Sequence, residues 1–208
     1  MLRGRCRHCH ARISFFYPAI ELAALGVAIW SAYLFSGIAL WASCGLGWTL
    51  IALAATDLKY FLLPDFLTLP LVVAGLLASA ILDRNSLSGH VLGTILGYLF
   101  VRVLRVAYRT LRGREGMGLG DAKLLAAAGA WVSWQGLPSV LVIASVLGLA
   151  GVLVQSLRGY RIHPAQHIPF GAFLSTGLWL VWLYGPLALG YMVQGNGSVR
   201  HKTETRRL

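Results

Sequence analysis

The sequence predicts an all-α fold, a polytopic transmembrane helical bundle of about seven spans. Of its 208 residues, 57% are hydrophobic and only 12% are charged, and apolar runs follow one another along nearly the whole chain. This balance lies far outside that of a soluble domain. Because lipid offers the backbone no hydrogen-bond partners, such runs must form helices that pack on one another. A soluble globular protein is therefore excluded.

About seven apolar stretches reach or approach the ~20 residues that a crossing needs. They cover residues 17–36, 38–56, 67–82, 91–107, 122–134, 139–157 and 168–184. The fifth stretch is short, so we expect it to be tilted, partly buried, or begun inside the glycine-rich segment before it. The chain then divides into a short cytoplasmic cysteine-containing segment (1–16), the bundle (17–193) and a basic C-terminal tail (194–208).

Basic residues predict the orientation of the bundle. Lys and Arg gather before the first stretch, after the second, between the fourth and fifth, and after the sixth, whereas the alternate loops carry almost none. We therefore expect a multi-pass protein of the bacterial inner membrane with a cytoplasmic N-terminus. The basic tail does not fit this rule, because seven spans would place it on the side of the membrane opposite the cytoplasm. Either the tail is an exception or the segment 186–193 folds back.

The chain carries 18 Lys and Arg against 7 Asp and Glu, a formal net charge of +11. Between residues 102 and 114, Arg occurs five times, mostly three or four positions apart. Such a juxtamembrane stretch favours contact with anionic lipid headgroups over a solvated helix face or a nucleic-acid patch. Membrane lipids are thus expected partners, and nucleic acid is not.

Asp57 and Asp121 are the most informative residues, because each carboxylate stands among apolar residues. Asp57 ends the second stretch, Asp121 starts the fifth, and Asp65 begins the third on the same predicted side. Charges close to the membrane are costly and usually mark a pathway or a reaction. A structural role is the alternative, since an Asp at a helix end can cap that helix or pair with Lys59 or Lys123.

Two carboxylates held close together support hydrolysis by acid and base. They cannot both ionise easily, so one keeps a proton while the other can deprotonate water. The water attacks a peptide carbonyl, and the protonated partner polarises that carbonyl or assists departure of the amine. Gly116, Gly118 and Gly120 would let an extended substrate strand approach the backbone. The pair titrates as a unit, so neither residue is assigned as the fixed acid or base.

Four segments, in order, resemble the type IV prepilin peptidases. TDLKYFLLPDFLTLPL is similar to the first aspartate motif of that family, and GMGLGDAKLLAAAGAW to the second, the Gly-x-Gly-Asp motif of intramembrane aspartyl proteases. LRGRCRHCHARISFFYPAIEL resembles the cytoplasmic cysteine segment, and HIPFGAFLSTG the late Pro-Phe-Gly motif. A lone Gly-x-Gly-Asp would be weak, whereas four motifs in order are specific.

The resemblance implies a function and its residues. Asp57 and Asp121 would be the catalytic pair, and Asp65, Lys123 and the glycines Gly118 and Gly120 would shape the site. The substrates would be prepilins of type IV pili or pseudopilins of type II secretion. Their short basic leader would be removed after a glycine at the cytoplasmic membrane face.

The cysteine segment departs from the family pattern. Cys6 and Cys9 form a C-x-x-C pair that can offer two thiolates to zinc, with His8 and His10 nearby. Fuller members of the family carry two such pairs after a further helix, and this chain begins at the second pair. Reduced thiols without metal are the favoured interpretation, and peptidase activity is expected to require no cofactor. N-methylation with S-adenosylmethionine goes with the fuller domain in the family, so we predict cleavage and leave methylation open.

Two other classes of function stay open from the sequence. The chain could be a non-catalytic assembly factor that binds pilins without cutting them. It could also be a small transporter in which Asp57 and Asp121 relay protons or bind a cation. A transporter predicts ion-dependent flux and no peptide product, whereas an assembly factor predicts binding that survives loss of both carboxylates.

Overall fold

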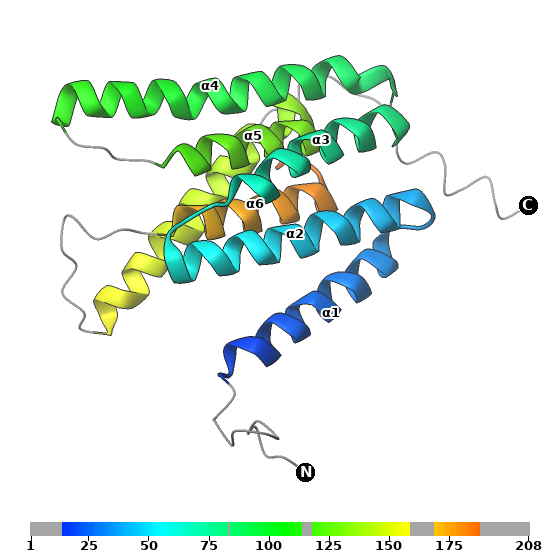
Figure 1. Ribbon diagram of the computed structural model, residues 1–208, viewed down its shortest axis with the longest axis horizontal. Coiled ribbons are helices and arrows are strands. Elements are labelled where there is room, and N and C mark those ends of the chain that lie inside the picture. The colour runs from blue at the N-terminus through cyan, green and yellow to red at the C-terminus, as the bar shows by residue number, and fades with distance from the viewer. Residues whose placement is uncertain (1–13, 83, 114–117, 159–168, 188–208) are drawn as a thin grey trace, which may run out of the picture.

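All the regular secondary structure in the described part of the chain is helical. The computed structural model describes residues 14–82, 84–113, 118–158 and 169–187. Its elements, labelled in Figure 1, are α1 (Phe16–Leu34), α2 (Ile38–Tyr60), α3 (Asp65–Leu82), the 3₁₀ turn η1 (Arg84–Ser86), α4 (Leu87–Arg112), α5 (Leu119–Leu157) and α6 (Phe170–Tyr184). Within these ranges five helices are long and apolar enough to cross a membrane, and α6 is a shorter apolar helix. The predicted all-α multi-pass bundle is confirmed.

The seven predicted stretches map onto six helices, because the fifth and sixth both lie within α5. The gap between the fifth and sixth stretches predicted a loop at 135–138. The break instead falls at Ser133, whose backbone is far from helical (φ 62°, ψ 172°). The two segments of α5 run as separate rods, green and yellow in Figure 1. The short fifth stretch is therefore an inner helix, joined to the sixth by a sharp turn.

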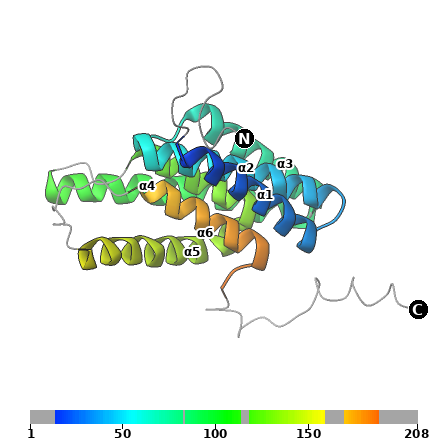
Figure 2. The same cartoon turned by 90° about the horizontal axis from the view of Figure 1, so that it is seen from below.

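Glycine contacts give the direction of each half of α5. On α4, Gly97 lies against the backbone of Leu125 and Gly93 against that of Gly129, so α4 runs antiparallel to the first half. On the second half, Gly151 contacts Phe173 of α6. Further along, Gly177 of α6 lies against Val140. The second half of α5 is thus antiparallel to α6, and the chain reverses at Ser133. In Figure 2, α6 lies between α2 and this second half, and α6 packs against both helices.

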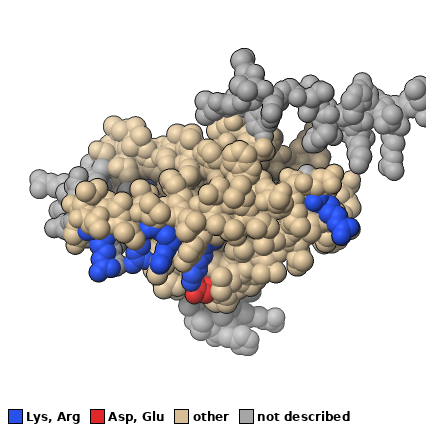
Figure 3. Space-filling view, turned by 90° about the horizontal axis from the view of Figure 1, so that it is seen from above, with Lys and Arg blue, Asp and Glu red and all other residues tan. Residues whose placement is uncertain are grey.

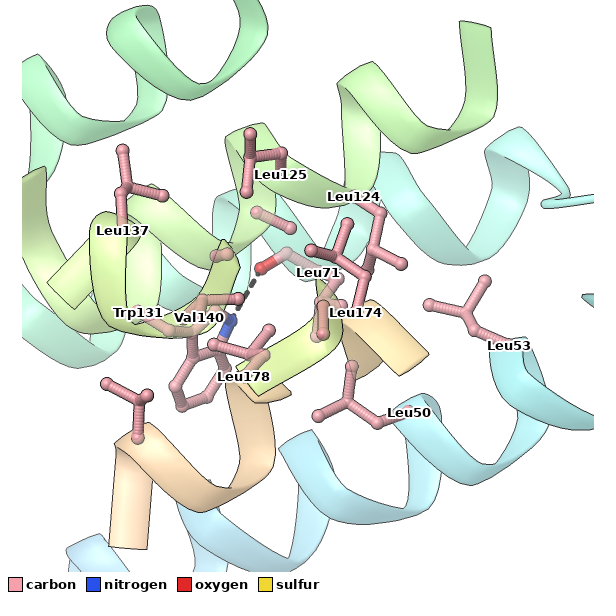
Figure 4. Packing of buried hydrophobic residues seen from close by; sticks show 14 of the residues in the cluster. Leu50, Leu53, Leu71, Leu124, Leu125, Trp131, Leu137, Val140, Leu174 and Leu178 are labelled. Carbon is pink, nitrogen blue, oxygen red and sulfur yellow. Dashed lines mark hydrogen bonds between the residues drawn. The ribbon is translucent and has the colours of Figure 1, made fainter. Parts of the chain in front are cut away.

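The first half of α5 forms the centre of the bundle. From Asp121 to Ser133 almost every residue is buried. Its alanines and Gly129 let neighbouring helices approach closely, because the driving force between membrane helices is close packing of small residues. Leucines from α2, α3 and α6 pack around this segment and Trp131 (Figure 4).

Indole and hydroxyl groups tie the helices together inside the bundle. Trp131 Nε1 donates to the carbonyl of Leu71 on α3 at 2.9 Å, drawn as a dashed line in Figure 4. Trp182 Nε1 donates to Ser43 Oγ at 3.1 Å, and Ser43 bonds Ser31 Oγ at 3.0 Å, which links α6, α2 and α1. Interhelical polar contacts of this kind are typical of membrane bundles.

Candidate active site

Asp57 lies in the last turn of α2 and is buried, with 5% of its surface exposed. Its Oδ2 accepts the backbone N–H of Ala172 at 2.9 Å, and the N–H of Gly171 also bonds this carboxylate. Both donors belong to the first turn of α6. A carboxylate at this position satisfies the free N–H groups of the turn and faces the positive end of the helix dipole. Asp57 of α2 therefore caps α6.

Asp121 lies in the first turn of α5, and 8% of its surface is exposed. Its carboxylate accepts the backbone N–H of Gly118, the N-cap residue of α5. This is the reach-back bond of a capping box, made from the third helical position. Asp121 also lies close enough to Asp57 for the two charges to repel each other.

Leu63 fills the space between the two carboxylate-bearing segments. A Cβ on Gly120 would fall 2.8 Å from Leu63 Cβ, and a Cβ on Gly171 would fall 2.8 Å from Leu63 Cδ1. The start of α5, the start of α6 and the loop after α2 thus converge on this side chain. We call this end of the bundle, which holds Asp57 and Asp121, the carboxylate end.

All four residues predicted to shape the site lie within the described part of the chain. Gly120 packs against Leu63, where a side chain would collide. Lys123 of α5 forms a salt bridge with Asp65 at the start of α3, so these two predicted residues bind each other. Gly118 is the exposed N-cap of α5 and a Cβ there would meet only ordinary contacts, the nearest at 3.6 Å.

The lysines do not neutralise the buried pair. Lys123 is engaged by Asp65, and Lys59 lies over the ring of Tyr60 at 5.1 Å. Neither Asp57 nor Asp121 forms a salt bridge with a Lys or Arg of the described ranges. Of the two structural roles that the sequence left open, helix capping is present at both residues, and pairing with these lysines is absent.

Basic side chains lie at the carboxylate end and on the last turns of α4. Arg102 and Arg109 are exposed and Arg105 is half-buried, and the guanidinium of Arg102 lies 5.9 Å from the centre of the Tyr98 ring. Viewed from the α4 side, Figure 3 shows blue side chains along one edge of the molecule. Long cationic side chains over an aromatic ring suit a membrane boundary, where the stem is apolar and the head is hydrated.

The candidate zinc ligands Cys6 and Cys9 lie outside the described residues, as does Gly116. In the part of the chain that the structure describes, no three His, Cys, Asp or Glu residues are grouped so as to hold a metal ion. Cys44 is a buried free thiol in α2.

Sequence reasoning missed the role of the α6 N-terminus. The sequence indicated no role for the Pro-Phe-Gly segment beyond its resemblance to the family motif. In the structure, the N–H groups of Gly171 and Ala172 donate to the carboxylate of Asp57, which is 115 positions before Ala172 in the sequence. A Cβ on Gly171 would fall 3.0 Å from Asp57 Oδ2. The glycine after Pro169 and Phe170 was the available signal, because only a residue without a side chain fits there.

Two buried carboxylates, carried by different helices to one end of an apolar bundle, define a multi-pass membrane protein with an aspartate-pair site. Residues 44–153 match the type IV leader peptidase family, and residues 1–35 match the bacterial peptidase A24 N-terminal domain. The chain belongs to the type IV leader peptidase family, which confirms the resemblance seen in the sequence.

Curated relatives carry the name prepilin leader peptidase/N-methyltransferase. The protein of Burkholderia pseudomallei (strain 1026b) is 48% identical over 178 residues, which are 85% of this chain and 57% of that protein. The protein of Aeromonas hydrophila is 46% identical over 187 residues, 88% of this chain and 63% of the relative. The chain therefore spans about three fifths of the length of these relatives. No solved structure matches it significantly.

Proposed function

We propose that the chain is a membrane-embedded aspartyl endopeptidase, with Asp57 and Asp121 as its catalytic pair. The observation that carries the proposal is that the two buried carboxylates approach each other without a described Lys or Arg between them. A charge in such surroundings is costly and usually serves a reaction or a pathway. Membership of the leader peptidase family supports a reaction.

The chemistry follows from the paired carboxylates. In the aspartic proteases two such groups share one proton. One carboxylate would take a proton from a water molecule, whose oxygen attacks the carbonyl carbon of the scissile peptide. The partner would donate its proton toward the carbonyl oxygen, and the C–N bond then breaks as the departing amine is protonated. The backbone donors from Gly171, Ala172 and Gly118 hold the two carboxylates in place for this step.

The proposed substrates are prepilins of type IV pili or pseudopilins of type II secretion, cut after a glycine that ends a basic leader. The names of the relatives support this substrate class. Anionic lipids are proposed partners of the α4 arginines, because a cationic helix end at a membrane boundary attracts their headgroups. Such lipids would also reduce the repulsion between a basic leader and a chain of net charge +11.

The proposed site of action is the cytoplasmic face of the inner membrane, with the N-terminus and the carboxylate end on that side. Gly113, which ends α4, and Gly118, which precedes α5, are at the carboxylate end, and the turn at 35–37 is at the opposite end of α2. A fluorescent-protein fusion after Gly113 should fluoresce, and an alkaline phosphatase fusion after Ser36 should be active outside. The reverse pattern would contradict this orientation.

The peptidase step is proposed to need no metal, since two carboxylates activate water by themselves in the mechanism above. Zinc at Cys6 and Cys9, if bound, would have a structural role. The relatives' names also include N-methyltransferase, so methylation of the product is tested separately from cleavage.

The test uses the purified chain in detergent with a prepilin. Mass spectrometry should find a product cut after the leader glycine, at the same rate with and without a chelator. The mass of the new N-terminus, with S-adenosylmethionine present, reports methylation in the same sample. An intact prepilin, or a cut elsewhere in the chain, would contradict the proposed function.

A further inference from the structure

A groove of about 310 Å³ runs between α2 and α3 on the membrane-facing surface. Small residues form much of both walls, spaced three or four positions apart. They are Ala42, Gly45 and Thr49 on α2, and Pro70, Ala74 and Ala78 on α3. The floor is Leu71 and Trp131. Among the described residues, no helix covers this groove from outside.

The groove offers no unsatisfied polar group to an occupant. Thr49 Oγ1 donates to the carbonyl of Gly45 at 2.8 Å, and the floor indole Trp131 Nε1 is bonded to the Leu71 carbonyl. A Cβ at Gly45 would meet no atom within 4 Å, so the position opens directly into the groove. Walls of small residues at helical spacing let another helix approach closely and are typical of transmembrane helix interfaces. The lining therefore fits an apolar helix.

The groove leads to the carboxylate end. Its α2 wall ends at Thr49, and Asp57 follows eight positions later on the same helix, or about 12 Å at 1.5 Å per residue. Its α3 wall begins at Phe66, next to Asp65. A helix lying in the groove would end near Thr49, and about four extended residues would span the remaining distance to Asp57.

We propose that this groove binds the apolar transmembrane helix of the protein substrate, and so places the adjoining extended segment at Asp57 and Asp121. The proposal rests on the endopeptidase function proposed above. In this proposal the α2–α3 groove aligns the scissile peptide, and the two carboxylates cleave it.

The first experiment measures binding without cleavage. A photoreactive amino acid placed at position 45 of the Asp121→Asn variant, in membranes with a prepilin, should crosslink to the apolar segment of the prepilin. The same group at position 26 is the matched control, because Gly26 on α1 is also a membrane-facing glycine with no atom within 4 Å of its Cβ position. Equal crosslinking at both positions, or none at position 45, would overturn the proposal.

The second experiment measures cleavage. Gly45→Leu and Ala74→Leu fill the groove from opposite walls and should each lower kcat/KM for a full-length prepilin by about tenfold, because the added side chains occupy the space in which a substrate helix would pack closely. Gly26→Leu should cleave like the unmodified chain. If all three variants cleave equally, lipid occupies the groove and the proposal is wrong, although the peptidase function stands. If the unmodified chain cuts no prepilin, the proposed function fails, and the crosslinking result still decides the groove.

Discussion

Asp57 stabilises a helix to which it does not belong. Its carboxylate receives two N–H groups from the first turn of α6, and Gly171 is the residue that lets that turn come so close. The position of Asp57 therefore depends on its own helix α2, on the start of α6, and on the absence of a side chain at Gly171. Asp121, in contrast, is held by a bond within its own helix start.

Gly171→Ala should displace Asp57 and lower the cleavage rate about 10- to 100-fold, because a shift of roughly 1 Å at a reacting group costs that much. The added Cβ would lie 3.0 Å from Oδ2 of Asp57 and 2.8 Å from Leu63 Cδ1. Prepilin cleavage kinetics give the rate. Gly148→Ala is the matched control, since its Cβ would make an ordinary 3.6 Å contact with Phe173 and should leave the rate unchanged. An unchanged rate for both variants would disprove the packing argument.

A salt bridge links the beginnings of α3 and α5 next to the site. The salt bridge joins Asp65, the first residue of α3, to Lys123 in the second turn of α5, two residues away from Asp121. Asp65 is 60% exposed and Lys123 27% exposed, so solvent screens the pair and its contribution to stability is small. Its value lies in fixing the relative position of the two helix starts.

A double-mutant cycle with Asp65→Asn and Lys123→Gln should give a coupling energy of about 0.2–1 kcal/mol in thermal unfolding in detergent. The double variant should then cleave prepilin no more slowly than the slower single variant, because the same link is lost in each case. Independent, additive losses would show that the two residues act separately.

The turn inside α5 is built on a residue that is poorly suited to it. Ser133 has φ 62° and ψ 172°, a region that is almost restricted to glycine. The turn nevertheless lets the chain reverse its direction between the inner and outer halves of α5 without a separate loop. Packing of the buried inner half against α3 and α4 holds it in place.

Ser133→Gly should stabilise the bundle by about 1 kcal/mol, because glycine adopts this backbone conformation without strain. The midpoint of thermal unfolding in detergent should rise by a few degrees. Ser133→Ala keeps a Cβ and should show no such rise. If alanine and glycine raise the midpoint equally, the serine side chain and not the backbone is the source of the effect.

At the scale of the whole molecule, the site consists of helix ends from α2, α5 and α6 that come together at one end of the bundle. Charge placement alone predicted that Asp57, Asp65 and Asp121 would share this end. Hydropathy likewise predicted the apolar stretches, because both signals are local in sequence. The arrangement of the helices around the inner half of α5 came only from the structure.

Three features of the structure could not be predicted from the sequence, because each depends on contacts between residues that are distant in the chain. The gap between the fifth and sixth apolar stretches predicted a loop at 135–138, whereas the turn lies at Ser133, inside the fifth stretch. The link between Asp57 and the start of α6 crosses 115 positions. A groove lined by small residues is also invisible until α2 and α3 are placed side by side.

The most direct test of the account replaces each carboxylate by its amide. Asp57→Asn and Asp121→Asn should each lower the rate of prepilin cleavage by about 10²–10⁴-fold, because an amide cannot take or give the proton. Each amide keeps an oxygen that can accept the backbone N–H bonds, so thermal unfolding should change little. Glu21→Gln, an exposed carboxylate on α1, is the control and should cleave normally. Full cleavage by either aspartate variant would contradict a catalytic pair.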